Sequence, residues 1–422
     1  MGRSCLCKRL HPRHDPDGLR PVGEPNMRIT HFEILRVPPS WVWLKIHTDT
    51  ELFGWGEPYL ENHPESVIAE VRRLEPLLVG KDPCRVESLW HTMYEGGSGY
   101  VGGPVKMSAI SGIDMALWDL AGKAAGLPVH GMLGGACQDR IRMYRAVGGQ
   151  LPWCVEPGQP YDAGWDPSRE PDWNFPEGHE EAARVIIEEW GFRCMKLHVG
   201  MGTGLEPTAE VDRIAEAYAA VRKGAGPDVE VAVDIHNPHP VMAKQMISAL
   251  TPHRPLFIEE PMPVERVDVL ADIARNSEIP IAAGERWMGK WIFYDALRKN
   301  ALSVMQPDLC HAGGITECHK IAVMGESAYA KLALHCPLSP LALAASIQVD
   351  ACASNFLVQE HNEVNCWREG GRTFIGKGYF AEPFVLDEDG CVAVPQGPGL
   401  GVDIDPVGFE QIMARPWRDV RG

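Results

Sequence analysis

PLFIEEP at 255–261 and IPIAAGE at 279–285 decide the fold, because each is a short apolar run that stops on an acidic side chain. The second half of the chain contains seven runs of this kind, and they end on Lys196 or His198, Asp234 or His236, Glu259, Glu285, Asp308, His335 and Glu360. In a barrel of parallel strands, the C-terminal strand ends meet at one mouth. The pattern therefore predicts that these side chains face one another across a single site.

The same runs predict the fold class. Eight apolar or β-branched runs follow Gly135, from IRMYRAV at 141–147 to NFLVQEH at 355–361, and helical patterns lie between most of them. Strand and helix alternating eight times is typical of a (β/α)8 barrel. Doubly wound sheets also alternate, but they seldom end so many successive strands on ionisable groups. We therefore expect an α/β protein with a modified TIM barrel over residues 137–361.

Residues 27–136 are expected to form an N-terminal α+β capping domain. ITHFEILRV and WVWLKIHTD alternate like strands, and apolar residues recur every three or four positions in a helix from Pro104 to Gly126. Residues 1–26 are rich in Arg, Pro and His and show no apolar periodicity. We expect them to be a disordered extension or a start-site artefact.

Residues 362–422 are expected to pack back on the capping domain and complete it. They include FVLDEDGCVAV, which predicts a hairpin around Asp389 and Gly390. Residues 148–179, between the first and second barrel runs, are rich in Pro, Gly and Trp and exceed the usual loop length. Because loops after barrel strands lie at the mouth, this segment either forms part of the pocket or is a surface loop or oligomer contact.

Composition excludes some classes of partner. The chain has 57 acidic and 40 basic side chains, a formal net charge of -17, so nucleic acid and anionic membranes are not expected as main partners. A small anionic substrate would need local positive charge. No apolar run approaches the roughly 18 residues of a membrane span, and the N-terminus lacks the apolar stretch of a signal peptide. We expect a cytoplasmic protein.

The twelve cysteines are scattered and form no CxxC pair, so no disulfide framework is predicted. Cys310 and Cys336 lie close to the strand-end residues, and either is a candidate nucleophile. Neither has an obvious activating partner, and scattered cysteines are more often buried, reduced hydrophobic residues. We favour that second interpretation.

Asp234, Glu259 and Glu285 end three successive runs, which places three carboxylates on adjacent strands. Such carboxylates repel one another and tend to take up protons. A divalent cation removes the conflict, and ligands that are all oxygen favour Mg²⁺, with Mn²⁺ as an alternative. The competing interpretation, ordinary ion pairs at strand ends, would suffice for one carboxylate but not for three in succession.

Asp308 and His335 end the next two runs. A carboxylate bonded to one ring nitrogen of a histidine fixes its tautomer and raises the basicity of the other nitrogen, so His335 is a candidate for proton transfer. His236 follows Asp234 by two residues, and in an extended chain both side chains project to the same side. His236 is therefore either a second acid/base group or a loop histidine in contact with solvent.

Lys196 and His198 are also two residues apart, on the second run, so both side chains should project to the same side of that strand. Lys196 would supply positive charge toward a bound carboxylate, and His198 is a further polar or catalytic group. Removal of a proton α to a carboxylate gives an enediolate, whose added charge a metal stabilises. Loss of a β-hydroxyl then gives dehydration, whereas return of the proton gives racemisation or epimerisation.

The stretches PLFIEEP, IPIAAGER, QPDLCHAGGITEC, LHCPLSPLALAA and LVQEH resemble the enolase superfamily, in its mandelate racemase subgroup. Within that subgroup the D-galactonate dehydratases are the most similar, and the resemblance covers nearly the whole chain from Met27. It implies the barrel, the capping domain, and a loop from Glu57 to His63 that closes over the substrate. His198 stands where those dehydratases carry Asn, so the resemblance does not identify which sugar acid is the substrate.

The resemblance also implies roles for the strand-end residues. It makes Asp234, Glu259 and Glu285 Mg²⁺ ligands, and it assigns acid/base or enediolate-binding roles to His236, the pair of Asp308 and His335, and Glu360. We expect a hydro-lyase that forms a 2-keto-3-deoxy acid from an aldonate or aldarate, in a homo-oligomer. Two alternatives are a racemase or epimerase of an α-hydroxy acid and a non-catalytic protein that binds acid sugars.

Overall fold

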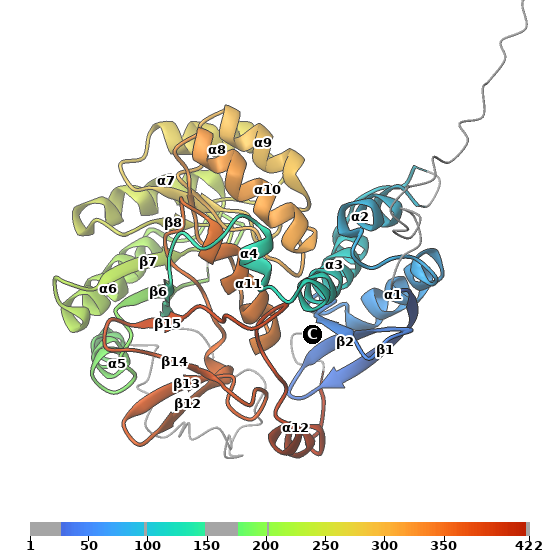
Figure 1. The fold of residues 1–422 in the computed structure, drawn as a ribbon. Coiled ribbons are helices and arrows are strands. Elements are labelled where there is room, and N and C mark those ends of the chain that lie inside the picture. Colours follow the sequence, from blue (N-terminus) through green and yellow to red (C-terminus); the bar gives the residue numbers. More distant parts are fainter. Residues whose placement is uncertain (1–26, 97–98, 148–175, 201, 419–422) are drawn as a thin grey trace, which may run out of the picture.

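The computed structural model describes residues 27–96, 99–147, 176–200 and 202–418. Figure 1 shows a barrel with helices α6 to α10 around its outside and a smaller domain, made of β1, β2 and helices α1 to α3, beside it. The predicted extension 1–26 and most of the long segment 148–179 lie outside the described residues. Among those described, no helix is both long and apolar enough to cross a membrane.

The barrel sheet is parallel throughout, as predicted. Within the described residues it has seven strands, in the order β11 (Lys331–Leu332), β10 (Val304–Met305), β9 (Ile281–Ala283), β8 (Ile258–Glu259), β7 (Glu230–Asp234), β6 (Cys194–His198) and β5 (Arg145–Val147). Helices follow the strands: α5 (Pro176–Glu188), α6 (Thr208–Ala225), α7 (Pro240–Leu250), α8 (Val267–Arg275), α9 (Lys290–Arg298), α10 (Gly314–Ser327) and α11 (Pro340–Cys352).

The eighth run closes the barrel without forming a regular strand. Phe356 makes a parallel bridge to Leu332 of β11, and Gln359 makes one to Met143 just before β5. The backbone of Gln359 accepts a hydrogen bond from the Tyr144 N–H at 3.0 Å. The eighth position of the barrel is therefore filled, and the strand ends form one ring, as the sequence pattern requires.

The predicted hairpin within FVLDEDGCVAV is wrong. The turn exists, because Asp387 Oδ1 accepts hydrogen bonds from the backbone N–H groups of Asp389 and Cys391. The strands on its two sides pair elsewhere, however. β14 (Phe384–Val385) joins β12 (Cys366–Glu369) and β13 (Arg372–Ile375), whereas β15 (Cys391–Ala393) pairs with β4 (Arg140–Arg142). The first predicted barrel run is accordingly split, and only its end enters the barrel as β5.

The capping domain has an antiparallel sheet of β1 (Ile29–Val37), β2 (Trp41–Thr48) and β3 (Phe53–Gly56). Its helices are α1 (Pro64–Leu78), α2 (Val86–Glu95) and α3 (Pro104–Ala125), and α4 (Val129–Met132) leads to the barrel. Helix α3 contacts β3 backbone to backbone, because a Cβ added to Gly56 would lie 1.9 Å from the Gly112 carbonyl oxygen. The contact lies at the end of β3, directly before the loop that begins at Glu57.

The C-terminal segment touches both parts of the molecule. Thr373 on β13 donates to the Trp190 carbonyl at 2.7 Å, which ties its sheet to the barrel. On α12 (Pro406–Met413), the Phe409 ring stacks on Trp43 of the capping domain. Trp417 then donates to the Trp41 carbonyl at 2.8 Å. The segment therefore joins the capping domain to the barrel.

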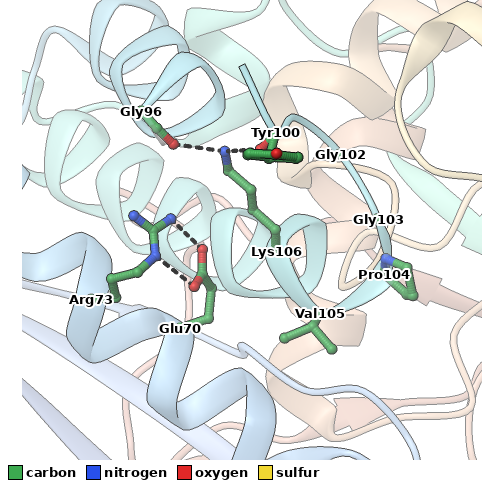
Figure 2. A pocket seen from close by; sticks show the side chains of 9 residues that line it. All are labelled: Glu70, Arg73, Gly96, Tyr100, Gly102, Gly103, Pro104, Val105 and Lys106. Atoms are coloured by element: carbon green, nitrogen blue, oxygen red, sulfur yellow. Dashed lines mark hydrogen bonds and ion pairs between the residues drawn. The ribbon is translucent and has the colours of Figure 1, made fainter. Parts of the chain in front are cut away.

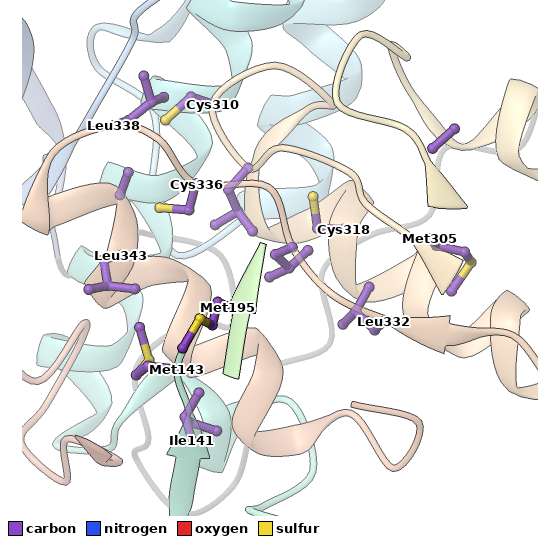
Figure 3. Close-up of a cluster of buried hydrophobic side chains, with 14 of the residues drawn as sticks. Ile141, Met143, Met195, Met305, Cys310, Cys318, Leu332, Cys336, Leu338 and Leu343 are labelled. Carbon is purple, nitrogen blue, oxygen red and sulfur yellow. The ribbon is translucent and has the colours of Figure 1, made fainter. Parts of the chain in front are cut away.

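The barrel core contains many sulfur atoms, as Figure 3 shows for Cys310, Cys318 and Cys336 among methionine and leucine side chains. All three thiols are buried and unoxidised. Burial raises the pKa of each well above its usual range, so the thiols stay protonated. This supports the interpretation of Cys310 and Cys336 as small hydrophobic residues rather than nucleophiles.

Replacement of Asp350 with Ala should stabilise the protein. Asp350 is buried in α11, and neither carboxyl oxygen has a hydrogen-bond partner among the described residues. An unpaired buried polar group costs about 1–3 kcal/mol, so the free energy of unfolding and the Tm should both rise. Thermal unfolding measures the change, with Asp212→Ala on the exposed face of α6 as the control.

The increase in the free energy of unfolding caused by Asp350→Ala should also depend on pH. Burial raises the pKa of Asp350 well above its usual range, so the native state holds a proton that the unfolded chain releases above about pH 4. Wild-type stability therefore falls as the pH rises, and Asp350→Ala should gain more at pH 8 than at pH 5. Equal or lower stability of the variant at pH 8 would mean that the carboxyl has a stabilising partner.

Candidate active site at the barrel mouth

The three predicted metal-binding carboxylates lie together. Asp234 ends β7, Glu259 ends β8 and Glu285 follows β9 by two residues, and one oxygen of each lies within 4.8 Å of the others. All three are buried. Burial, together with the charges of Asp234 and Glu285, raises the pKa of Glu259 to about 8 despite the nearby Lys196. Three buried carboxylates that repel one another in this way form a suitable site for a divalent cation.

Lys196 lies on the inner side of the same cluster. Its Nζ donates to both oxygens of Glu259, at 2.8 and 2.9 Å, and lies 2.9 Å from Glu360 Oε1. Burial opposes its charge, but Glu259 and Glu360 raise the pKa of Lys196 well above its usual range. The raised pKa favours the charged form, and the ammonium group is already shared by two carboxylates of the protein, rather than free to face a substrate as the sequence suggested.

The pair of Asp308 and His335 forms as predicted. His335 Nδ1 lies 2.8 Å from Asp308 Oδ2, and the other carboxylate oxygen accepts from the Cys310 backbone N–H at 2.6 Å. His335 Nε2 lies 3.4 Å from Glu285 Oε2. Burial alone would lower the pKa of His335, but Glu285, Glu360 and Asp308 raise it to about 10. Its Nε2 therefore points toward the carboxylate cluster, where it can hold or release a proton.

His236 reaches the site by a different backbone path from the one expected. The chain is no longer extended there, since His236 has a φ of 53°. Its backbone N–H donates to Asp234 Oδ1 at 2.9 Å, and its Nδ1 lies 3.0 Å from Asp234 Oδ2. That contact with Asp234 raises the pKa of His236. The side chain lies beside Asp234 because the turn folds back, not because the strand continues.

His198 approaches the same carboxylate from β6. Its Nδ1 lies 3.2 Å from Asp234 Oδ2, and its ring centroid is 4.5 Å from that of His236. Burial lowers the pKa of His198 to about 4, so the imidazole is neutral near pH 7. The two histidines thus form one edge of the site, around Asp234.

Sequence reasoning missed a group of polar residues behind His236. Arg286 Nη1 lies 2.7 Å from Glu260 Oε2 and 2.6 Å from Glu285 Oε1, and its Nη2 lies 3.4 Å from His236 Nε2. Glu260 is buried and has a φ of 48°. Both residues directly follow a predicted ligand in sequence, in EEP and GER, and this adjacency was the available signal. Gln306, which donates to Glu259 at 2.7 Å, gave no such signal.

Two acidic residues of the capping domain also reach the barrel mouth. Glu57 is buried and accepts hydrogen bonds from the hydroxyl and the backbone N–H of Ser339, the latter at 3.3 Å. It also accepts one from the Ala342 N–H at 3.2 Å. It therefore caps α11, which begins shortly after His335. Burial raises the pKa of Glu57 to about 8. Glu61 contacts the loop that follows Asp308.

A hollow lies away from the barrel mouth, on the capping domain (Figure 2). It measures about 530 Å³, and Glu70, Arg73 and Lys106 are its charged lining residues. Arg73 is bonded to Glu70, and Lys106 Nζ donates to the carbonyl oxygens of Tyr94, Gly96 and Tyr100. Because these charged groups already have partners within the protein, the barrel mouth is the better candidate for chemistry.

Comparison with known families matches both parts of the chain. Residues 36–134 match the mandelate racemase / muconate lactonizing enzyme N-terminal domain, and residues 178–407 match the enolase C-terminal domain-like family. A curated relative named D-galactonate dehydratase, from Ralstonia nicotianae, is 41% identical over 90% of this chain and 92% of its own.

Two solved structures share the fold. A mandelate racemase/muconate lactonizing enzyme from Jannaschia sp. CCS1 has a TM-score of 0.77 at 28% identity, over 91% of this chain and 97% of its own. A protein from Agrobacterium radiobacter, described as a candidate galactarate dehydratase with Na and L-malate bound, has a TM-score of 0.76 at 29% identity, over 91% and 94%.

Proposed function

Because the chain belongs to the mandelate racemase/muconate lactonizing enzyme family, we propose that it dehydrates a sugar acid to a 2-keto-3-deoxy acid with the help of Mg²⁺. The substrate class is an aldonate or aldarate, in line with the names of the galactonate and galactarate dehydratases to which the chain is similar. A cytoplasmic location and a homo-oligomeric assembly are part of the same proposal.

The positions of His236 and His335 on opposite sides of the barrel are the observation that supports dehydration. His236 follows β7 and His335 follows β11, and these strands are four positions apart in an eight-position barrel. The two imidazoles therefore approach the mouth from opposite sides, with the three carboxylates between them. This arrangement suits a reaction in which one group removes the α proton and another delivers a proton to the departing β-hydroxyl.

Asp234, Glu259 and Glu285 would hold the metal, and their oxygen-only donor set favours Mg²⁺ over softer metals, with Mn²⁺ as an alternative. When bound, the cation would stabilise the negative charge that develops on the substrate carboxylate. Lys196 holds Glu259 from the inner side, which keeps one ligand in place. His198, neutral and next to Asp234, would contact a substrate hydroxyl.

We assign proton abstraction to His335. Its Nδ1 is engaged by Asp308, so Nε2 is the nitrogen that would take the proton from the substrate. Nε2 must be unprotonated for that step, and a cation held by Glu285 would offset one of the charges that raise the pKa of His335. His236 would then protonate the β-hydroxyl as it leaves. Glu360 lies between Lys196 and His335, which lower its pKa to about 2 against the effect of burial. We place Glu360 beside the enediolate, where it would need to take up a proton before it could donate a hydrogen bond.

A racemase or epimerase is the second candidate, because two imidazoles on opposite sides of one carbon can exchange protons on both of its faces. A library of aldonates and aldarates, incubated with the enzyme and Mg²⁺, separates the two. A dehydratase gives a 2-keto acid from at least one member of the library, whereas an epimerase returns a stereoisomer of the substrate. Failure of every acid to give a 2-keto product would rule out the proposed function.

A further inference from the structure

His311 is a buried histidine that the proposed mechanism does not use. It follows Asp308 by three residues and is 4% exposed. Its Nδ1 lies 3.1 Å from the Ser108 hydroxyl, and its Nε2 lies 3.1 Å from Glu61 Oε2. Ser108 and Glu61 both belong to the capping domain. His311 therefore joins the two domains at the edge of the active site.

The loop that carries His311 is held by helix α3. Ser111 accepts from the Gly313 backbone N–H at 2.9 Å, and Asp114 accepts from the Thr316 N–H at 2.9 Å. With Ser108, these side chains form one polar stripe at a spacing of three residues along the helix. The stripe fixes the backbone after Asp308, so the His311 ring has a defined position relative to the dyad.

The same ring also faces the dyad itself. His311 Nε2 lies 3.8 Å from Asp308 Oδ2, which is the oxygen that His335 Nδ1 approaches at 2.8 Å. One carboxylate oxygen is therefore hydrogen-bonded to His335 and lies close to a second imidazole, that of His311. Burial opposes a charge on His311, but Asp308 and Glu61 raise its pKa to about 9, while the charge of His335 acts in the opposite direction. His311 is a cation between two carboxylates.

We propose that His311 is a positioning residue through which Glu61 of the capping domain controls the dyad of Asp308 and His335. Glu61 holds the His311 cation, so that Asp308 Oδ2 remains bonded to His335. When Glu61 is displaced or neutral, His311 pairs with Asp308 and draws that oxygen away from His335. Proton transfer therefore requires that the loop after β3 is in the position in which Glu61 contacts His311. The inference rests on the proposed function for its kinetic test.

Neutralisation of Glu61 tests the coupling. Glu61→Gln should lower kcat by about tenfold, with a smaller change in KM, because a misplaced base slows the chemical step more than binding. His311→Gln removes the competing cation, so the double variant should be about threefold or more faster than Glu61→Gln alone. A purely structural role predicts the reverse, namely that the two losses multiply.

A second readout does not depend on turnover. The downfield proton resonance of the hydrogen bond between Asp308 and His335 should shift in Glu61→Gln and return toward the wild-type position in the double variant. Glu65→Gln, at an exposed position at the start of α1, is the matched control and should leave both readouts unchanged. If the wild type turns over no acid sugar, the proposed function fails and the resonance still decides the inference. An unshifted resonance in Glu61→Gln, or losses that multiply, would overturn it.

Discussion

Replacement of His335 with Asn should lower kcat for the sugar acid by about 10³-fold or more, because general acid–base catalysis contributes up to about 10⁴-fold. The reason is geometric: Nε2 of His335 faces the carboxylate cluster while Asp308 holds Nδ1 at 2.8 Å. Exchange of the substrate α proton with D2O should be lost together with dehydration, since both need the base. Steady-state kinetics and proton NMR in D2O measure the two.

His236→Asn should behave differently, because we propose that His236, on the opposite side of the barrel, protonates the leaving hydroxyl. Dehydration should fall, whereas exchange of the α proton should persist. His91→Asn, on an exposed part of α2, is the control and should retain both activities. Exchange that survives in His335→Asn but disappears in His236→Asn would reverse the two assignments.

Replacement of Glu285 with Gln should abolish the response of the protein to Mg²⁺. In the wild type, Mg²⁺ at 100 times its Kd should raise the free energy of unfolding by about 2.7 kcal/mol. Glu285 supplies one of three buried carboxylates, and a neutral amide there removes one of the three charges that we propose bind the cation, so the Tm of the variant should no longer rise with Mg²⁺. The dehydratase activity should fall with it, by at least about 10²-fold, because even residues that only orient a metal ligand can cost that much when replaced.

Glu278→Gln provides the control for that experiment, because Glu278 lies in the loop before β9 and outside the carboxylate cluster. Its Tm should rise with Mg²⁺ as much as that of the wild type. Thermal unfolding with and without Mg²⁺, each in the presence and absence of EDTA, measures both variants. An unchanged Mg²⁺ response in Glu285→Gln would remove this residue from the metal site.

The sequence predicted the barrel and most of the strand-end cluster because both follow from local patterns. An apolar run that ends on Asp234 or Glu259 specifies a strand and, through the parallel topology, the place where its last side chain lies. The pair of Asp308 and His335 was predictable for the same reason, since two neighbouring strands carry them. To predict these contacts, it was enough to know which strands are neighbours in the barrel.

Other features depend on contacts between distant segments, which no local pattern records. The pairing of β15 with β4 joins residues about 250 positions apart, so the turn after Val385 was correctly placed while its hairpin was wrong. His236 and Glu260 adopt positive φ values that their residue types seldom show. The contact between Glu61 and His311 crosses two domains, so it was not predicted, although each residue lies in a stretch that the family resemblance includes.

Turnover of an active sugar acid in D2O, followed by proton NMR, tests the central claim most directly. If the enzyme is a dehydratase, the 2-keto-3-deoxy acid should form and carry deuterium at C3, and exchange of the substrate α proton should occur only together with formation of that acid. The remaining substrate should keep its configuration. Exchange or inversion at the α carbon, with no keto acid formed, would contradict the account and establish an epimerase instead.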